Sequence, residues 1–574
     1  MTAVVADSRP PATARLQFDL LGPLFCILAV LLAVLVVLPL AWLLRQALVD
    51  DAGHSTLANF AALVTDTTLR KPFLVAIGMA LSVGVVSCAV ATPLAWLVAR
   101  TDLPGRRLLR ALVAASFVTP PFLGAIAWEL LAAPNSGVIN VLYRRLAGAG
   151  QYATLVDIYT FTGLVFAIAC YTFPYVFTLV ANGLDRVPSD LEDASSILGA
   201  RGFTTLRRVT LPLVVPAMLA GSLIAVLQAL TMFGSPAVLS LPAGFHVITT
   251  KIWSLFQFPP KPGIAAAASL PLLLVTVLLL QGKAWILGRK RYTVLGGRSG
   301  QPRIAHLRRY KPLAVVFAFG VVSLTVLLPY AALLKTALTK NVAAPLTWSE
   351  LTLRNFEFVL FEFSATKAAL WHTLLLGAST ATLGSAIALF TAYMVSRNPV
   401  RGARVLGMLA TAPVAIPGIV LGVALFLTYS RPPFMLYGTL WILLIAFVTI
   451  EMPASYQQMS AAFHGIHPEL EDASRILGAS RLQTLWRITV PLLRTSVIAT
   501  WCFVFIGTIR ELSATILLTT ADTKVVSVII YDLNESGDMG AISVLGLLLL
   551  AISFAVVFVA NRLPVLGGER PPAV

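Results

Sequence analysis

Long apolar stretches constrain the fold of this chain more than any other feature of its sequence. Twelve of them follow one another along the 574 residues. Most are about 20 residues or longer, enough for a helix to cross a hydrocarbon core roughly 30 Å thick. Hydrophobic residues make up 58% of the chain and charged residues only 12%, a balance that excludes a soluble globular protein. The sequence therefore predicts an all-α, polytopic membrane protein with about 12 transmembrane helices.

The expected spans divide evenly between the two halves of the chain. They cover residues 20–44, 73–99, 111–132, 159–182, 211–233 and 263–287 in the first half, and 313–334, 373–395, 405–429, 437–459, 495–510 and 540–560 in the second. The first run is too long for the core of a signal peptide and lacks a small-residue cleavage site, so we expect it to remain as a span. The third run contains Pro120, Pro121 and Glu129, and the eleventh ends at Arg510 and Glu511.

The net charge of +17 is concentrated in short loops beside the apolar runs. Residues 100–110 carry four arginines and one acid, residues 396–404 carry three arginines and no acid, and residues 289–311 carry eight Lys or Arg and no acid. Short basic loops remain in the cytoplasm, so this pattern indicates orientation in a bilayer and not binding to nucleic acid. With six spans in each half, both termini are then expected in the cytoplasm.

One polar segment occurs twice. Residues 191–216 and 470–495 are identical at fifteen of 26 aligned positions, 279 residues apart, and residues 36–48 resemble residues 326–338. An even number of spans in each half makes the repeats parallel and relates them by an axis along the membrane normal, as in many transporters with a central pathway. The expected division of the chain is a first six-helix repeat, a basic cytoplasmic linker and a second six-helix repeat, over residues 1–288, 289–311 and 312–574.

Each copy of the polar segment is expected to form a short helix. Ser189 and Glu192 have the S-x-x-E spacing of a capping box at the helix start. An apolar stripe at helical spacing follows. Gly199, or Gly478 in the second copy, should end the helix because glycine tolerates the left-handed conformation.

The order of residues in this segment resembles the E-A-A loop of ABC importer permeases of the first type. Both copies read Glu-Asp-Ala where the family motif has Glu-Ala-Ala, followed by a glycine five residues after the alanine and then by a hydrophobic residue and a proline. In that family the loop is a coupling helix that docks on a cytoplasmic ATPase. The resemblance implies coupling loops at about 185–212 and 464–491. It implies the ATPase-docking residues Glu192, Asp193, Ala194, Gly199, Ala200, Glu471, Asp472, Ala473, Gly478 and Ala479.

The resemblance also implies the partners of the chain. Two copies of a cytoplasmic ABC ATPase would bind the loops and hold ATP and Mg²⁺. A periplasmic or surface-tethered binding protein would deliver the solute at the bacterial cytoplasmic (inner) membrane. The sequence has no G-x-x-x-x-G-K-[ST] phosphate loop, no recognisable catalytic set and no assigned metal ligands. We therefore expect a transport subunit without a cofactor of its own, and not an enzyme.

Fusion of two permease halves in one chain resembles the ferric iron permeases of this superfamily. The stretches FGSPAVL at 233–239 and ELSATILL at 511–518 add to that resemblance. Ferric iron is the first expectation for the solute. A phosphonate, a sugar phosphate, thiamine or another small solute is open within the same class, and an ion-coupled 6+6 secondary transporter is the competing class.

Charged residues within or beside the spans are candidates for the translocation pathway, because a charge there is costly. They are Glu129, Glu451, Arg510 and Glu511. Carboxylates would suit a hard cation, whereas an anion would need Arg510, Lys251 or a helix N-terminus. Each carboxylate has the alternative of a structural role, as an ion-pair partner or a helix cap. The sequence does not choose between these readings.

Overall fold

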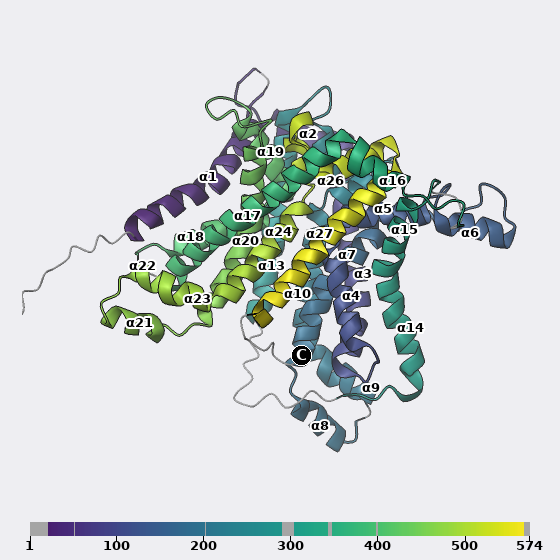
Figure 1. Ribbon diagram of the computed structural model, residues 1–574, viewed down its shortest axis with the longest axis horizontal. Coiled ribbons are helices and arrows are strands. Elements are labelled where there is room, and N and C mark those ends of the chain that lie inside the picture. Colours follow the sequence, from purple (N-terminus) through teal and green to yellow (C-terminus); the bar gives the residue numbers. More distant parts are fainter. Residues whose placement is uncertain are drawn as a thin grey trace, which may run out of the picture.

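The computed structural model describes residues 21–50, 52–200, 202–289, 304–341, 347–397 and 400–566. Helices make up most of this part of the chain (Figure 1). Extended pairing within it is limited to three isolated bridges, Val49 with Ser55, Thr101 with Ala305 and Thr339 with Leu351. The predicted all-α class is confirmed.

The helices of the first half are α1 (Leu21–Ala47), α2 (Ala58–Thr65), α3 (Thr67–Arg100), α4 (Arg106–Val118), α5 (Pro121–Ala132), α6 (Val138–Ala147), α7 (Phe161–Asp185), α8 (Ser189–Ile197), α9 (Gly202–Thr205), the π-helical turn η1 (Leu206–Thr210), α10 (Leu211–Thr231), α11 (Gly234–Ser240), α12 (Ile248–Ser254) and α13 (Pro262–Arg289).

Those of the second half are η2 (Arg308–Tyr310), α14 (Lys311–Val322), η3 (Ser323–Leu327), α15 (Leu328–Ala337), α16 (Arg354–Glu357), η4 (Phe358–Glu362), α17 (Ser364–Arg397), α18 (Arg404–Thr411), η5 (Ala412–Ala415), α19 (Gly418–Tyr429), α20 (Leu440–His464), α21 (Glu469–Ile476), α22 (Arg481–Thr484), η6 (Leu485–Thr489), α23 (Val490–Leu492), α24 (Arg494–Ile509), α25 (Thr515–Leu518), η7 (Ala521–Thr523), α26 (Val526–Ser536) and α27 (Met539–Leu566).

Nine helical stretches of the described chain are long and apolar enough to cross a membrane, and three bent pairs bring the number to as many as twelve. The bent pairs are α4 with α5, α18–η5 with α19, and the pair that meets at Leu493. The first two coincide with the third and ninth expected spans. The eleventh expected span, residues 495–510, corresponds to α24, which follows the bend at Leu493. The predicted set of about twelve spans is confirmed, and the run that contains Pro120 and Pro121 forms a bent helix.

Each repeat is built on the same three packed spans. In the first repeat α3, α7 and α10 pack against one another, and in the second α17, α20 and α24 do. Glycines allow the close approach: a Cβ atom on Gly221 in α10 would lie 2.8 Å from the Cα atom of Val176 in α7. Because lipid tails give membrane helices little hydrophobic drive to associate, tight packing of this kind holds the spans together.

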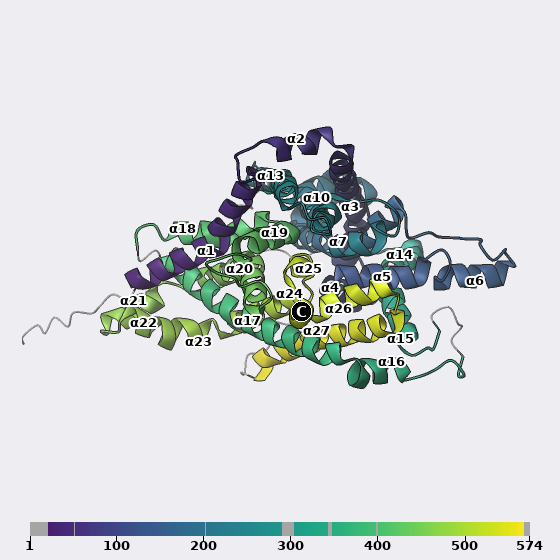
Figure 2. The ribbon, with the colours of Figure 1, turned by 90° about the horizontal axis from the view of Figure 1, so that it is seen from above.

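The first span of each repeat packs against both repeats. α1 lies against α13 of its own repeat and against α18 and α19 of the second, and α15 lies against α27 of its own repeat and against α5 of the first. Figure 2 shows α1 beside α18 and α19, although these elements are far apart in the chain. One hydrophobic core cluster consequently runs through both repeats.

An asparagine at an equivalent place in each repeat binds the end of the first span by hydrogen bonds. The Asn59 amide donates to the carbonyl of Ala47 at the end of α1 and to the carbonyl of Val49 just beyond it, each at 3.1 Å. The Asn355 amide donates to the carbonyls of Ala337 and Thr339, each at 3.1 Å, at the end of α15. Both side chains satisfy carbonyls that have no partner within their own helix.

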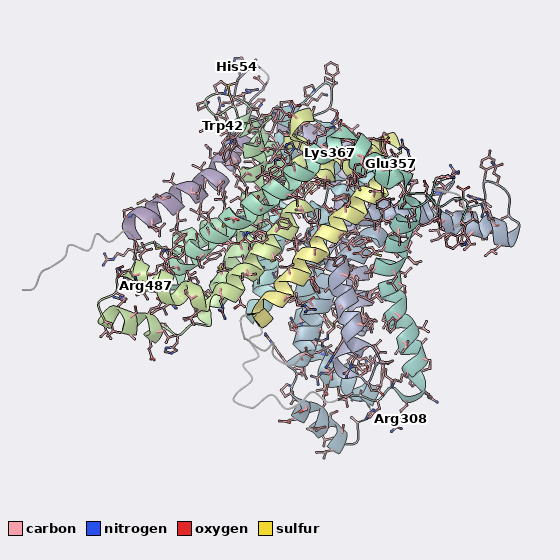
Figure 3. All side chains as sticks on the ribbon, in the orientation of Figure 1. Trp42, His54, Arg308, Glu357, Lys367 and Arg487 are labelled. Carbon is pink, nitrogen blue, oxygen red and sulfur yellow. The ribbon has the colours of Figure 1, made fainter. Side chains whose placement is uncertain are left out.

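The two repeats run in the same direction. Figure 1 shows the short helices α8 and α9, and α21 and α22, on one side of the bundle, and α2 and α16 on the other. We call these sides the loop-helix face and the opposite face. Arg308 and Arg487 lie on the loop-helix face, and His54 and Glu357 lie on the opposite face (Figure 3). This arrangement is that of the predicted parallel repeat.

The end of the expected linker packs on the first repeat. Residues 290–303 of the predicted 289–311 linker lie outside the described residues. Next to the bridge to Thr101, Asp102 accepts a hydrogen bond from the backbone of Leu307 at 2.9 Å and lies 3.2 Å from the Lys311 ammonium. The Leu307 hydrogen bond, together with Lys311, lowers the pKa of Asp102 below its usual value.

Candidate functional site

A cavity of about 360 Å³ lies between the two repeats. The first repeat contributes Pro121, Phe122, Tyr175, Leu227, Gln228, Thr231, Met232 and Gly234, and the second contributes Pro413, Val414, Ile416, Pro417, Gly418, Ile450, Glu451, Pro453, Ala454, Gln457, Gly507, Arg510, Glu511, Leu512 and Ser513. Two carboxylates, one guanidinium and two amides therefore share a chamber with apolar side chains. Convergent polar groups among apolar side chains in a cavity are typical of a ligand site.

Both repeats break their third span at this cavity. α4 meets α5 at an angle of 102°, and α18–η5 meets α19 at 110°. Prolines cause the breaks, because the ring removes an N–H donor and disfavours a helical conformation in the preceding residue. Pro121 and Pro417 lie at the breaks and line the cavity. The N-termini of α5 and α19 thus border the chamber.

Arg510 joins the two repeats across this break. It follows the last residue of α24, and its guanidinium donates to the carbonyl of Phe117 at 2.7 Å. Phe117 lies in the last turn of α4, where carbonyls lack a partner within the helix. The guanidinium also lies 5.5 Å from the centre of the Phe117 ring, within range of a cation–π contact.

The two carboxylates of the cavity come from different elements, Glu511 from the segment after α24 and Glu451 from α20. Glu511 accepts a hydrogen bond from the backbone N–H of Ala514 at 2.8 Å. Glu451 in α20 packs against Gly507, where an added Cβ atom would lie 2.6 Å from the Glu451 carboxyl carbon. Gly507 therefore provides the space that brings the Glu451 carboxylate to the cavity.

Glu129 occupies a different environment from the other three candidate pathway residues. It is buried in α5 and does not line the cavity. One carboxylate oxygen accepts a hydrogen bond from the Tyr159 hydroxyl at 2.6 Å, and the other is buried without a protein partner. The structure brings Glu451, Arg510 and Glu511 together and leaves Glu129 behind the cavity wall.

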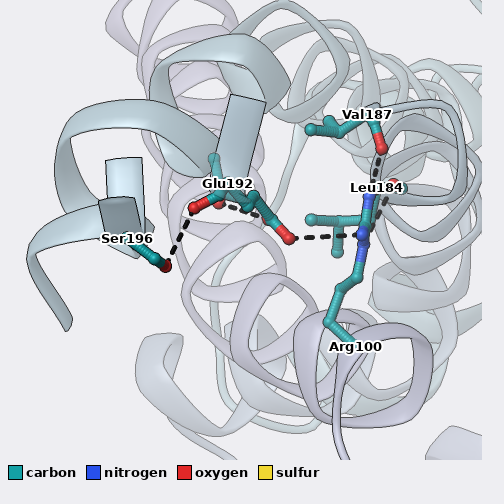
Figure 4. Close-up of polar contacts among 6 residues, drawn as sticks. Arg100, Leu184, Val187, Glu192 and Ser196 are labelled. Atoms are coloured by element: carbon teal, nitrogen blue, oxygen red, sulfur yellow. Dashed lines mark hydrogen bonds and ion pairs between the residues drawn. The ribbon is translucent and has the colours of Figure 1, made fainter. Parts of the chain in front are cut away.

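The repeated polar segments form two short helices on the loop-helix face. In the first, the Glu192 carboxylate turns inward, where one oxygen lies 3.5 Å from the Arg100 guanidinium (Figure 4). The other oxygen accepts a hydrogen bond from Thr210 at 2.7 Å. Arg100 also donates to the carbonyls of Leu184 and Val187. This set ties α8 to the ends of α3, α7 and η1.

The second repeat forms the same set of contacts. Arg397 at the end of α17 donates to the Glu471 carboxylate at 3.0 Å, and Thr489 donates to the same oxygen at 3.0 Å. Arg397 also donates to the carbonyl of Ile466 at 3.3 Å. Both threonines end a π-helical turn, a feature that is frequent at functional positions. The sequence does not distinguish either arginine from the other basic residues of its loop.

The glycines end both helices as predicted. Gly199 and Gly478 adopt φ of +81° and +90°, in the left-handed region. The predicted capping box at Ser189 is wrong: Ser189 is the first helical residue, Pro188 precedes it, and no side chain caps the helix start. Glu192 is instead directed at Arg100, a buried cation that the sequence pattern of the loop does not reveal.

The other predicted docking residues lie on the outward side of the loop helices. Those exposed are Asp193, Ala194, Gly199, Asp472, Ala473 and Gly478, with Ala200 and Ala479 half-buried. Beside them Ile197 and Leu198 are 86% and 87% exposed, and Ile476 and Leu477 are 85% and 89% exposed. Adjacent large apolar side chains at this exposure mark a surface that a partner covers.

The fold and the shared cavity define a polytopic membrane protein with two like halves around one chamber. Residues 91–292 and 384–564 each match the family described as the binding-protein-dependent transport system inner membrane component. The chain belongs to this family, and it contains the family domain twice.

Individual relatives carry different solutes in their names. The chain is 26% identical, over 79% of its length, to the ferric transport system permease protein FbpB of Actinobacillus pleuropneumoniae, and it spans 65% of that protein. It is 30% identical, over 42% of its length and 86% of the relative, to the sulfate transport system permease protein CysT of Salmonella typhimurium. A chain in the crystal structure of a bacterial ABC transporter involved in alginate import is similar to 48% of this chain over 96% of its own length, with 16% identity and a TM-score of 0.38.

We predict that Arg100→Gln loosens α8 from the bundle. The substitution leaves the Glu192 carboxylate buried without its guanidinium, a change that costs about 3–5 kcal/mol for buried pairs. Trypsin cleavage within residues 186–208 should accelerate at least about tenfold, because local opening exposes the loop. The control is Arg110→Gln, which removes a half-exposed ion pair to Asp185 at 3.8 Å and should leave the cleavage rate unchanged. Equal rates in both variants would contradict the anchoring role of Arg100.

Proposed function

We propose that this chain is the pore-forming subunit of an ATP-driven importer that receives its solute from a binding protein. Membership of the binding-protein-dependent family supports the class. The observation that carries the proposal is the pair of loop helices, each held by the same Arg–Glu–Thr set and each presenting two exposed apolar side chains. A secondary transporter has no use for such paired docking helices.

In this proposal the loop-helix face is cytoplasmic, with both termini on that side. The basic loops at 100–110 and 396–404 adjoin α8 and α21, in agreement with retention of positive charge in the cytoplasm. Two copies of a cytoplasmic ATPase bind the two loop helices and supply ATP hydrolysis. The chain contributes no phosphate-binding loop to that reaction.

The anchor contacts explain how ATPase movement would reach the cavity. Arg100 joins α8 to α3 and to the end of α7, while Thr210 joins it to η1, which continues into α10. These three spans are the packed core of the first repeat, and α10 contributes Gln228 and Thr231 to the cavity. A displacement of α8 would therefore move one whole wall of the chamber.

We propose ferric iron as the solute. The ferric relative supports this choice. So do the two carboxylates of the cavity, because hard cations prefer oxygen ligands. An anion such as sulfate is the second candidate, favoured by Arg510 and by the helix N-termini at Pro121 and Pro417. The two candidates make opposite demands on the charged residues.

The docking proposal predicts that Ile197→Asp together with Ile476→Asp abolishes ATPase binding. The chain is purified from its native membrane in mild detergent, and its partners are identified and counted. We expect two ATPase copies with the wild-type chain and none with the variant, because a charge cannot replace a buried apolar contact without a large loss. Val64→Asp on the opposite face, 69% exposed before substitution, is the matched control. Retention of both ATPase copies by the double variant would disprove this docking surface.

Replacement of both loop glycines with valine should uncouple ATP hydrolysis from transport. Each valine would be forced into a left-handed conformation that costs about 1–2 kcal/mol, so the end of the docking helix would be reshaped while the spans still insert. ATP hydrolysis and uptake are measured together in vesicles for Gly199→Val with Gly478→Val. Gly202→Val is the control, since nothing lies within 4 Å of its added Cβ atom and its φ is not positive. Normal uptake in the double variant would contradict the coupling role.

The solute proposal predicts that Glu451→Gln lowers ferric uptake by about tenfold, the effect of losing roughly 1.4 kcal/mol of interaction. Gln457→Asn, another residue of the cavity wall, should have little effect. An anionic solute would give the reverse result: Glu451→Gln would preserve uptake, and Arg510→Gln would abolish it. Uptake of labelled iron and of labelled sulfate in the same vesicles distinguishes the two.

A further inference from the structure

The first repeat carries a lobe that the second repeat lacks. Residues 133–160 separate α5 from α7, whereas only residues 430–439 separate α19 from α20. α6 and the loop after it make up most of the longer connection, which we call the 133–160 lobe. Because the second repeat completes its six spans without such a lobe, the lobe serves a purpose other than building the bundle.

The lobe projects sideways from the bundle, toward the opposite face. It connects the ends of α5 and α7 that lie away from the loop-helix face. Figures 1 and 2 both show α6 extending laterally past α5, away from the other spans. In Figure 1 it lies toward the same side as α2 and α16. A helix that leaves the end of a span and extends outward at this level meets the bilayer surface.

The polar side of α6 is already occupied by the lobe itself. The Asn140 amide donates to the carbonyls of Ala133 and Val156 at 2.9 and 2.7 Å, and its oxygen accepts from the backbone of Leu155 at 2.8 Å. Arg144, one turn later, donates to the carbonyl of Ala153 at 3.2 Å. These bonds fold the loop onto one side of α6 and leave its other side uncovered.

The uncovered side of α6 is apolar. Val138, Leu142 and Leu146 follow at helical spacing, so they form one stripe. Val138 packs against the core, Leu142 is 53% exposed and Leu146 is 79% exposed. The stripe thus continues the hydrophobic surface of the spans outward along the lobe. Tyr152 in the loop, 83% exposed, adds a residue type that is enriched at membrane interfaces.

Positive charge borders this stripe. Arg145 precedes Leu146 and is exposed. An exposed cation at the bilayer surface is stabilised by a nearby anionic group. Phosphate headgroups supply that anion at the level where the stripe enters the acyl region.

We propose that the 133–160 lobe is a membrane-interface anchor that binds phospholipid in the leaflet of the opposite face. Leu142 and Leu146 enter the boundary between headgroups and acyl chains, and Arg145 binds the phosphates. This is the arrangement of amphipathic helices that lie in the plane of a membrane. A binding protein that delivers solute is a poorer candidate for the partner of this lobe, because the lobe points away from the cavity shared by the repeats.

The test measures the depth of Leu146 in a bilayer. The test uses the full chain in vesicles of phosphatidylethanolamine and phosphatidylglycerol. Alanine replaces Cys26, Cys88 and Cys502, and the buried Cys170 is retained. The substitution Leu146→Cys then provides the site for a small fluorophore. His54→Cys in the loop before α2 is the water-exposed control, and Val30→Cys in α1, 64% exposed, is the lipid-exposed control. We expect lipids with a spin label near the headgroup to quench a fluorophore at position 146 about threefold more than one at position 54. Iodide in the water should quench the fluorophore at position 146 correspondingly less than the one at position 54.

The proposal would be overturned if the spin-labelled lipids and iodide each quenched the label at position 146 to the same extent as the label at position 54. So would protection of the label from iodide only when a loaded binding protein is added, since that result assigns the lobe to the binding protein. A second variant tests the charge: Arg145→Gln should reduce lipid quenching at Leu146 in phosphatidylglycerol vesicles and leave it unchanged in neutral phosphatidylcholine. An equal change in both vesicles would remove the headgroup-binding part of the proposal.

Discussion

A buried guanidinium–carboxylate pair at the end of the second span governs how each loop helix relates to the bundle. Arg100 contacts Glu192 of α8 together with backbone carbonyls at the end of α7, and Arg397 holds the same position in the second repeat. Ion pairs removed from water are strong only when further hydrogen bonds satisfy them. Thr210 and Thr489 supply these bonds from the π-helical turns. The loop helices are therefore parts of the packed three-helix cores and not flexible appendages.

The broken third spans provide the cavity with its polar backbone. Unpaired carbonyls and N–H groups are tolerated at membrane depth only where they are buried in protein or border a cavity, and both breaks lie there. The charged side chains, in contrast, all come from the second repeat. Thr172 and Thr231 occupy the positions 279 residues before Glu451 and Arg510. A duplicated scaffold thus surrounds a site whose chemistry belongs to one half.

The sequence was sufficient for the spans, the duplication and the glycines that end the loop helices, because periodicity and backbone conformation are local properties. It was insufficient for Arg100 and Arg397, which are 297 residues apart, whereas their partners Glu192 and Glu471 are 279 apart. The 133–160 lobe causes this change of spacing. Nor could the sequence separate Glu129 from Glu451, because both are acids within apolar runs and only packing decides which one reaches the cavity.

The contact of each first span with the other repeat has a consequence for the order in which the protein can fold. A span inserted early in synthesis normally finds its neighbours among the next few helices. α1 packs on α13 of its own repeat and also on α18 and α19, which leave the ribosome only after the whole first repeat and the linker have been made. Until then lipid must solvate the side of α1 that later becomes buried. Neither repeat can close its core alone, so the covalent linker keeps two mutually dependent halves within reach during assembly.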